Sequence, residues 1–160
     1  MSYRIGLGYD VHQLAFGETL WLGGILIPHD KGLVAHSDGD VLLHAICDAL
    51  LGAAKLRDIG FHFPDTSSEF KNIDSKILLS ETYRLVTEKG FRLVNLDVTI
   101  SAEQPKLKEF IPQMEQTIAH VLSVDVEAIN IKATTTEKLG FEGREEGISV
   151  QAVVLIEKIQ

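Results

Sequence analysis

The chain has 160 residues, and its 23 Asp and Glu against 15 Lys and Arg give a formal net charge of −8 with histidine neutral. This length predicts a single domain, residues 1–160, with a sizeable core. The acidic balance excludes DNA or RNA as the main partner, because phosphate backbones are bound by clustered basic residues. The one cysteine, Cys47, excludes an internal disulfide and a cysteine-rich zinc site, and we expect it to be a small buried residue.

The sequence contains no segment typical of export, organelle import or membrane insertion. It has no basic stretch followed by an apolar run, as in a secretory leader, and no Arg- and Ser-rich amphipathic stretch, as in a transit peptide. The longest apolar run, residues 41–54, is interrupted by His44 and Asp48 and is too short to span a bilayer. We therefore expect a cytoplasmic protein.

Hydrophobic periodicity predicts an α/β fold. Within residues 91–103, for example, Val94, Leu96 and Val98 alternate with polar residues, as in a strand with one buried face. Helices and strands alternate along the chain, which favours a two-layer α/β (α+β) sandwich, a mixed β-sheet covered by helices on one face. The predicted strands are 3–8, 19–27, 91–103, 129–135 and 148–159, and the predicted helices are 37–55, 75–89 and 109–122.

Some boundaries of these elements carry local signals. Gly23 and Gly24, inside the second predicted strand, indicate a bulge or a close backbone approach. Ser37 and Asp40 fit a capping box that begins the first helix. Gly90 fits the position just after the C-terminus of the second helix.

Asp10, His12 and His44 are the first candidates for chemistry. Residues i and i+2 of a strand point to the same side, so Asp10 and His12 are expected to converge. His44 lies in an otherwise apolar helix, on one stripe with Asp40 and Asp48. Two histidines and a carboxylate form a zinc site with an open position, and Asp40 and Asp48 would orient His44 from behind. A hydrogen-bonded polar seam, or a subunit contact without metal, explains the same residues.

Two further segments have the chemistry of phosphate binding. A predicted strand ends in Thr134, Thr135 and Thr136, whose hydroxyl and backbone N–H groups can cradle an anion, and Glu137 could hold a Mg²⁺ shared with the phosphates. An ordinary threonine-rich strand is the alternative. Residues 36–40, His-Ser-Asp-Gly-Asp, place free N–H groups at a helix start, where capping alone is the alternative.

Other segments narrow the choice of chemistry. Residues 58–60 and 63–66 are rich in turn formers, and an ordered turn explains them without a function. The Gly-Leu-Gly at 6–8 lacks the third glycine of a dinucleotide fingerprint, and no Gly-Lys-Ser/Thr phosphate loop is present. No serine or cysteine nucleophile motif is recognisable, so covalent catalysis has little support.

Taken together and in order, these motifs resemble one family. They are Gly-x-Asp-Val-His at 8–12, His-Ser-Asp-Gly-Asp-Val at 36–41, Asp-Ile-Gly at 58–60, Phe-Pro-Asp-Thr at 63–66 and Lys-Ala-Thr-Thr-Thr-Glu-Lys-Leu-Gly-Phe at 132–141. The whole chain resembles the 2-C-methyl-D-erythritol 2,4-cyclodiphosphate synthase family of the non-mevalonate isoprenoid pathway, and the run at 132–141 is its most specific part.

The resemblance implies a bacterial cytoplasmic lyase and a homotrimer of α/β subunits with active sites at the subunit interfaces. The implied substrate is 4-diphosphocytidyl-2-C-methyl-D-erythritol 2-phosphate. Its 2-phosphate attacks the β-phosphate and gives the cyclic 2,4-diphosphate and CMP. Two alternatives stay open: a metal-dependent phosphohydrolase, and a non-catalytic trimer that binds a nucleotide or an isoprenoid diphosphate.

The resemblance also assigns roles. It implies that Asp10, His12 and His44 bind Zn²⁺ or another divalent cation, that Glu137 faces Mg²⁺ or Mn²⁺ on the diphosphate, and that His36 and Thr135 stabilise the transition state. Asp58 and Gly60 would hold the ribose, and residues 102–108 and 133–135 the cytosine. Phe141 and Arg144 would lie near a threefold cavity that can hold an isoprenoid diphosphate. The residues implied in substrate binding are Asp10, His12, His36, Ser37, Asp58, Ile59, Gly60, Phe63, Asp65, Thr66, Ala102, Pro105, Lys106, Leu107, Lys108, Ala133, Thr134, Thr135, Thr136, Glu137, Phe141 and Arg144.

The chain departs from the family in one place. Leu107 stands where methionine is frequent, and Lys108 where an apolar residue is common. If backbone groups recognise the base, neither change should alter binding.

Overall fold

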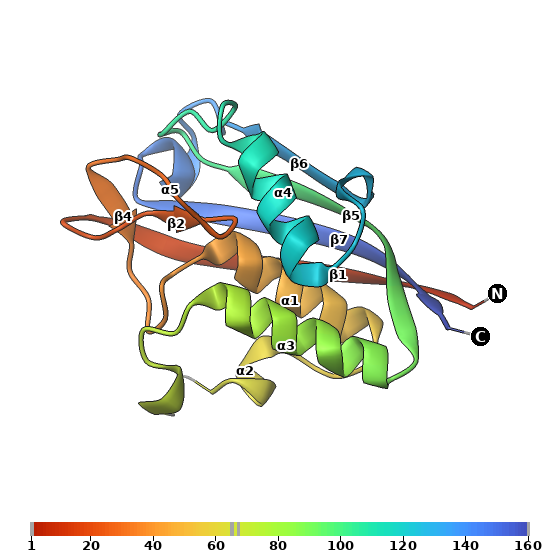
Figure 1. Cartoon of the computed structure of the whole chain (residues 1–160). Coiled ribbons are helices and arrows are strands. Elements are labelled where there is room, and N and C mark those ends of the chain that lie inside the picture. The colour runs from red at the N-terminus through yellow and green to blue at the C-terminus, as the bar shows by residue number, and fades with distance from the viewer. Residues whose placement is uncertain (1, 65, 67, 160) are drawn as a thin grey trace.

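The computed structural model, described here for residues 2–64, 66 and 68–159 (without the side chain of Glu69), contains a mixed sheet with its helices on one face (Figure 1). The five strands lie in the order β4-β1-β7-β5-β6. β5 and β6 are parallel, and the other neighbours are antiparallel. This confirms the expected mixed α/β sheet. The strands are β1 (Tyr3–Phe16), β4 (Lys31–Leu33), β5 (Phe91–Ser101), β6 (Ile129–Thr134) and β7 (Gly147–Lys158).

Three helices form the second layer, and all three lie in front of the sheet in Figure 1. α1 packs on β1 and β7 at the centre, α3 lies beside α1, and α4 covers β6. Cys47, in α1, is fully buried as expected, and burial raises the pKa of its thiol to about 12. No helix in the described part of the chain is long and apolar enough to cross a membrane. The helices are α1 (Val41–Ala53), α3 (Ser75–Glu88) and α4 (Ile111–Leu122), with the short α2 (Ile59–His62) and α5 (Gly140–Gly143) and 3₁₀ turns at Ser68–Phe70 and Val126–Ala128.

Two glycines of β1 allow α1 to lie directly on the sheet. Both face the helix layer, and a Cβ at Gly6 or Gly8 would lie only 1.9 or 1.8 Å from the carbonyl oxygen of Ala49 or Ala45. Real Cβ atoms do not approach a backbone so closely, so only glycine fits at these two positions. The Gly-Leu-Gly of the sequence therefore serves helix packing, not nucleotide binding.

The prediction of one strand over 19–27 is wrong. The structure has a small hairpin of β2 (Trp21–Leu22) and β3 (Ile25–Leu26), and the two residues between them, Gly23 and Gly24, have positive φ values of 64° and 76°. Two such residues in succession form the tight turn that joins twisted antiparallel strands.

The predicted capping box is also wrong. α1 begins at Val41, and its N-cap is Asp40, whose carboxylate accepts from Leu43 N–H and from the N–H groups of Gly23 and Gly24. One buried carboxylate thereby holds the hairpin turn and the helix together, which Ser37, three residues earlier, does not do.

The face of the sheet opposite the helices is apolar and open. Alternate residues of β1 point to it, and Ile5 and Leu7 remain 75% and 67% exposed. Exposed apolar patches of this kind mark interaction surfaces. The large apolar side chains on this open face are Tyr3, Ile5, Leu7, Tyr9 and Val11 of β1, Val94 of β5 and Val153 of β7.

The edge strand β6 is closed to further pairing near its middle. Glu115, from α4, accepts a hydrogen bond from the N–H of Ile131 at 2.9 Å. An unpaired strand edge attracts other strands, and a side-chain acceptor on the edge removes one of its free donors.

Candidate metal centre and substrate pockets

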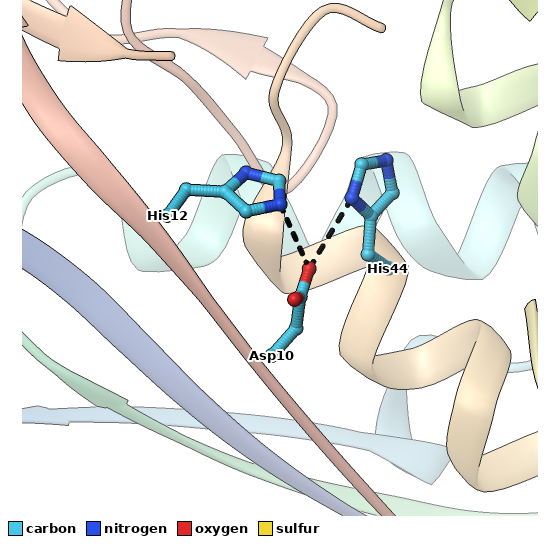
Figure 2. Close-up of side chains that lie close together, drawn as sticks. All are labelled: Asp10, His12 and His44. Atoms are coloured by element: carbon cyan, nitrogen blue, oxygen red, sulfur yellow. Dashed lines mark ion pairs between the residues drawn. The ribbon is translucent and has the colours of Figure 1, made fainter. Parts of the chain in front are cut away.

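Asp10, His12 and His44 converge in the structure (Figure 2). The carboxylate oxygen Oδ2 of Asp10 lies 3.1 Å from Nε2 of His12 and 3.3 Å from Nδ1 of His44. The candidate ligand atoms all lie within 4.8 Å of one another, and this is the one such group in the part of the chain that the structure describes. The i, i+2 positions on β1 and the adjacent face of α1 bring it together, as predicted.

The surroundings of His12 fit a cation at this point. Its Nδ1 lies 2.8 Å from the carbonyl oxygen of Gly39, which only accepts, so Nδ1 donates. In the neutral ring Nε2 therefore carries a lone pair, and this lone pair faces Asp10. Two electron-rich atoms at this distance need a proton or a metal ion between them. Such a second hydrogen bond to a backbone carbonyl is typical of metal-bound histidine.

The pKa shifts follow the same geometry. Burial opposes the ionised form of Asp10. The hydrogen bonds and charges of His12 and His44 outweigh burial and hold the pKa of Asp10 well below its ordinary value. Burial likewise opposes the cationic form of His12, but the contact with Asp10 and the Gly39 carbonyl raise its pKa. The metal-free site thus stabilises positive charge beside an ionised carboxylate.

A cavity of about 260 Å³ opens over the Asp10, His12 and His44 group. It brings together residues from β1, the loop before α1, α1 itself and α2, which are far apart in the sequence. Its predicted site residues are Asp10, His12, His36, Ser37, His44, Ile59, Gly60 and Phe63, and its other lining residues are Val34, Ala35, Phe70, Ile73 and Leu78.

The loop that carries His36 and Ser37 is tied to the segment before α3. The N–H of Asn72 donates to the carbonyl of His36 at 2.9 Å, and the N–H of Asp38 donates to the carbonyl of Ile73 at 3.2 Å. These two backbone bonds fix the loop whose residues His36 and Ser37 line the cavity, where the sequence predicted phosphate contacts.

The expected support of His44 by Asp40 and Asp48 is wrong. Asp40 is committed to the hairpin and to the start of α1, and burial raises its pKa. Asp48 accepts from the N–H of Ile59 at 2.7 Å and so anchors α2, and burial raises its pKa too. Asp40 and Asp48 lie on the same side of α1 as His44. Their carboxylates accept hydrogen bonds from backbone N–H groups of the hairpin and of α2, not from the His44 ring.

Two serines lie at the far side of the His44 ring instead. Ser75 Oγ is 2.8 Å and Ser37 Oγ 3.3 Å from Nε2 of His44. Ser75 in turn contacts Asp38. Sequence reasoning missed Ser75 and Asp38 as site residues, because Ser75 is 31 positions from His44 and its only local signal is that of a helix start.

A second cavity, of about 370 Å³, lies beside other strands, near the C-terminal ends of β5 and β6. Pairing through β7 puts Asp10 of β1 level with Ile100 of β5, so both cavities lie toward the same end of the strands. Most residues expected at the cytosine line it, including Lys108 beside Leu107. Thr135 belongs to this cavity and His36 to the first, so one chain does not bring these two together. The lining residues are Ala102, Pro105, Lys106, Leu107, Lys108, Ile111, Ile131, Lys132, Ala133, Thr134 and Thr135.

The remaining predicted residues lie around the two cavities. Thr135 donates to the carboxylate of Glu137 at 3.3 Å, and Thr136 donates to the carbonyl of Leu139 at 2.5 Å. Arg144 pairs with Glu146 at 2.8 Å just after α5, the short helix that contains Phe141.

Three predicted residues belong to the segment that includes α2. Asp58 is the residue before this helix, and Thr66 is exposed. Asp65 lies outside the described residues.

Fold and site together define an α/β protein with a candidate divalent-cation centre beneath a cavity. The YgbB family model matches residues 3–157, and the chain belongs to this family. A relative from Bacteroides thetaiotaomicron, named 2-C-methyl-D-erythritol 2,4-cyclodiphosphate synthase, is 65% identical over 99% of both chains. A relative of the same name from Azotobacter vinelandii is 61% identical over 96% of this chain and 98% of its own.

Solved structures with this fold agree. The bifunctional IspDF of Campylobacter jejuni superimposes with a TM-score of 0.96 at 48% identity, over 99% of this chain, which spans 43% of the length of that protein. An IspF–CDP complex from Plasmodium falciparum superimposes with a TM-score of 0.87 at 33% identity, over 99% of this chain and 98% of its own.

Proposed function

We propose that the chain is a 2-C-methyl-D-erythritol 2,4-cyclodiphosphate synthase of the non-mevalonate isoprenoid pathway. It converts 4-diphosphocytidyl-2-C-methyl-D-erythritol 2-phosphate to the cyclic 2,4-diphosphate and CMP. The observation that carries the proposal is the cavity in which the Asp10, His12 and His44 group meets the loop of His36 and Ser37. The names of the relatives support the same activity.

The reaction depends more on the positioning of the two phosphate groups than on proton transfer. An oxygen of the 2-phosphate forms a bond to the β-phosphorus, and the bond from that phosphorus to the bridging oxygen breaks, so that CMP leaves with the electron pair. The nucleophile is already an anion, so no general base is needed. Holding the two phosphates in line removes an entropic barrier, and well-oriented intramolecular reactions gain about 7–11 kcal/mol in this way.

The chain's own groups supply the frame for this step. Asp10, His12 and His44 would hold a divalent cation, with Zn²⁺ suited to two imidazoles and one carboxylate. Such a cation supplies Lewis-acid stabilisation of phosphate charge. His36 and Ser37 face the same cavity and are suited to donate to phosphate oxygens. Glu137, with its Thr135 partner, would face a Mg²⁺ or Mn²⁺ on the diphosphate.

The second cavity is suited to the cytidine. Its lining by Ala102 and by residues 105–108 and 131–135 offers backbone groups, which can distinguish cytosine without charged side chains. The CDP complex of the Plasmodium falciparum relative supports a cytidine-linked ligand. In this interpretation Leu107 and Lys108 leave base recognition unchanged, and Asp58 and Gly60 hold the ribose.

The active enzyme is proposed to be a homotrimer with its sites between subunits. The open apolar face of the sheet supports an assembly that covers it, because Ile5 and Leu7 are otherwise left in water. The metal cavity and the base cavity lie apart in one chain, and a neighbouring subunit would bring His36 of one copy to Thr135 of another. Phe141 and Arg144 would then line a threefold cavity with room for an isoprenoid diphosphate.

Two broader proposals follow from the same relationships. The family match over residues 3–157 supports the interpretation of residues 1–160 as one cyclodiphosphate synthase domain. The bacterial relatives support a bacterial cytoplasmic enzyme.

Incubation with the proposed substrate, with and without a chelator, tests the activity. We expect ³¹P NMR to show equal amounts of CMP and the cyclic diphosphate, and the chelator to stop both. An open-chain phosphate product would indicate a phosphohydrolase instead. Tight binding of CDP with no turnover would indicate a non-catalytic trimer.

A further inference from the structure

A continuous chain of hydrogen bonds runs behind His44, away from the cavity. Nε2 of His44 lies 2.8 Å from the hydroxyl oxygen of Ser75, and that oxygen lies 2.5 Å from Oδ1 of Asp38. The backbone N–H of Ser75 also donates to the other carboxylate oxygen of Asp38, at 2.8 Å. Asp38 thus accepts from Ser75 twice, through one side-chain and one backbone donor.

The donor and acceptor in each of these hydrogen bonds follow from Asp38, the last group in the series. The carboxylate of Asp38 only accepts, so the hydroxyl of Ser75 must donate its one proton to it. Ser75 Oγ then has only lone pairs left for His44, so Nε2 of His44 must carry the proton and donate. In the neutral ring this leaves the lone pair on Nδ1, the atom that faces Asp10 at 3.3 Å.

We propose that Asp38 and Ser75 are positioning residues that fix the His44 ring with its Nδ1 lone pair aimed at the cation site. The inference rests on the proposed metal site and extends it to two residues that lie behind the ligand. His12 is fixed in the opposite sense, because its Nδ1 donates to Gly39 and its Nε2 faces Asp10. Each histidine therefore has one nitrogen held by the protein and the other directed at the same point.

The location of Ser75 makes this role specific. It is the first residue of α3 and is fully buried, although a serine at a helix start is ordinarily exposed. A buried hydroxyl costs free energy unless both its donor and its acceptor capacity are used, and here Asp38 uses one and His44 the other. These hydrogen bonds also link Ser75 of α3 and Asp38, in the loop before α1, to the proposed metal ligand His44 on α1.

Ser75→Ala is the main test, with Asp74→Ala as its matched control. Asp74 caps the same helix through Lys76 N–H and pairs with the Lys76 ammonium, and among the described residues it makes no contact with His44. We expect Ser75→Ala to weaken zinc binding to the metal-free protein by about 10–100-fold, the typical effect of losing a partner behind a metal-bound histidine. Asp74→Ala should leave zinc affinity unchanged, even where it lowers the unfolding temperature. Competition with a chromophoric chelator measures both.

Asp38→Ala gives an independent readout. Without the carboxylate, the hydroxyl proton of Ser75 is free to turn toward His44, where it opposes the Nε2–H donor. Asp38 also accepts from the N–H of Asp40 at 3.1 Å, so the folded state of the variant is checked by its unfolding temperature. Long-range ¹H–¹⁵N NMR on the zinc-loaded protein should show a His44 Nε2–H that exchanges slowly with water in the wild type and faster in this variant, together with weaker zinc binding.

Three results would overturn the proposal. One is a Ser75→Ala protein that binds zinc as tightly as the wild type. Another is an Asp74→Ala protein that loses as much affinity as Ser75→Ala, since the effect would then be that of helix stability alone. The third is a zinc-loaded wild type whose His44 Nε2–H exchanges with water as fast as in Asp38→Ala. A wild type with no affinity for any divalent cation would instead overturn the metal site of the proposed function, and the positioning role with it.

Discussion

The α-carbon of Gly8 in β1 lies directly beneath the carbonyl oxygen of Ala45 in α1, so close that a Cβ at position 8 would come within 1.8 Å of that oxygen. Ala45 is the neighbour of His44, and Gly8 is two residues from Asp10. The backbone contact between strand and helix therefore sets how deeply the helix sits and how far the His44 ring stands from the ligands on β1.

Gly8→Ala is expected to push α1 off the sheet. Overpacking of this kind costs roughly 1–3 kcal/mol of unfolding free energy, and zinc affinity should fall with it because His44 moves. Gly52→Ala is the control, since a Cβ at this helical glycine meets nothing within 4 Å. Replacing a helical glycine with alanine should stabilise the protein by about 0.5–1 kcal/mol. Chemical denaturation measures both, and an undisturbed Gly8→Ala protein would contradict the packing argument.

His44→Ala is expected to lose the metal and the activity while keeping the assembly. The histidine supplies one of three ligand atoms, and the open face of the sheet lies on the other side of β1. Zinc content, turnover and sedimentation are the three measurements, and His120→Ala, at an exposed position on α4, is the control. Near-normal turnover without bound zinc would make the metal assignment wrong.

Zinc binding is expected to weaken as the pH falls. A metal ion must displace any proton on His12, whose pKa lies above its ordinary value of 6.5 in the metal-free site, whereas Asp10 stays ionised because its pKa is lowered. The apparent affinity should therefore fall from pH 8 to pH 6, with proton release on binding. Calorimetry in buffers of different ionisation enthalpy measures both, and a pH-independent affinity would contradict the geometry of the site.

The metal-free protein should show the opposite trend in stability. A raised folded-state pKa at His12 gives stability that is fully present below the unfolded value near 6.5 and is lost as the pH rises through the folded value. Its unfolding temperature at fixed protein concentration should thus fall from pH 6 to pH 8, and less so in His12→Asn. Equal slopes for the two proteins would remove His12 as the cause.

Thr135→Ala is expected to lower kcat by more than it raises KM. A hydroxyl that donates to developing phosphate charge acts in the transition state, and loss of such a donor costs about 10²–10³-fold in kcat. Thr117→Ala on α4, where the hydroxyl donates to the carbonyl of Gln113, should leave both constants unchanged. A loss confined to KM would reduce the role of Thr135 to binding of the ground state.

Leu7→Glu is expected to prevent formation of the proposed trimer. Leu7 is 67% exposed in the single chain, and a carboxylate buried without a partner in an assembled face costs several kcal/mol. Ile77→Glu, at a residue of similar size that is 58% exposed on α3, should leave the trimer intact. Light scattering distinguishes the two, and an unchanged trimer in Leu7→Glu would place the interface elsewhere.

Hydrophobic periodicity predicted most of the helices and strands, but it missed the hairpin turn at Gly23 and Gly24, where two residues reverse the direction of the chain. The helix expected over 75–89 is observed at Ser75–Glu88, because its apolar stripe and the glycine after it both mark it. The strand expected over 3–8 continues to Phe16, since the polar residues from Asp10 onward hide its alternation. The hairpin at Gly23 and Gly24 was missed because each of its strands has only two residues, too few for any period to show.

Some residues of the site could be grouped from the sequence, and others are brought together only by the fold. Asp10 and His12 are related by strand spacing, and the polar position of His44 in an apolar helix requires a partner, so sequence alone could group the three. Asp40 and Asp48 have the same helical spacing, yet they bind backbone N–H groups, whose positions depend on the fold. Ser75 reaches His44 only because α3 lies beside α1, and no spacing rule connects two helices.

Glu115, which occupies the N–H of Ile131 on the outer strand, also has a consequence for how copies of this chain can associate. A strand from another molecule that approached β6 would find one needed donor already occupied, so lateral extension of the sheet is disfavoured at this edge. Lateral extension has no natural end and leads to fibres, whereas contact through the broad apolar face can close on itself after a few copies. At the β6 edge, one glutamate on α4 thus acts against filament growth.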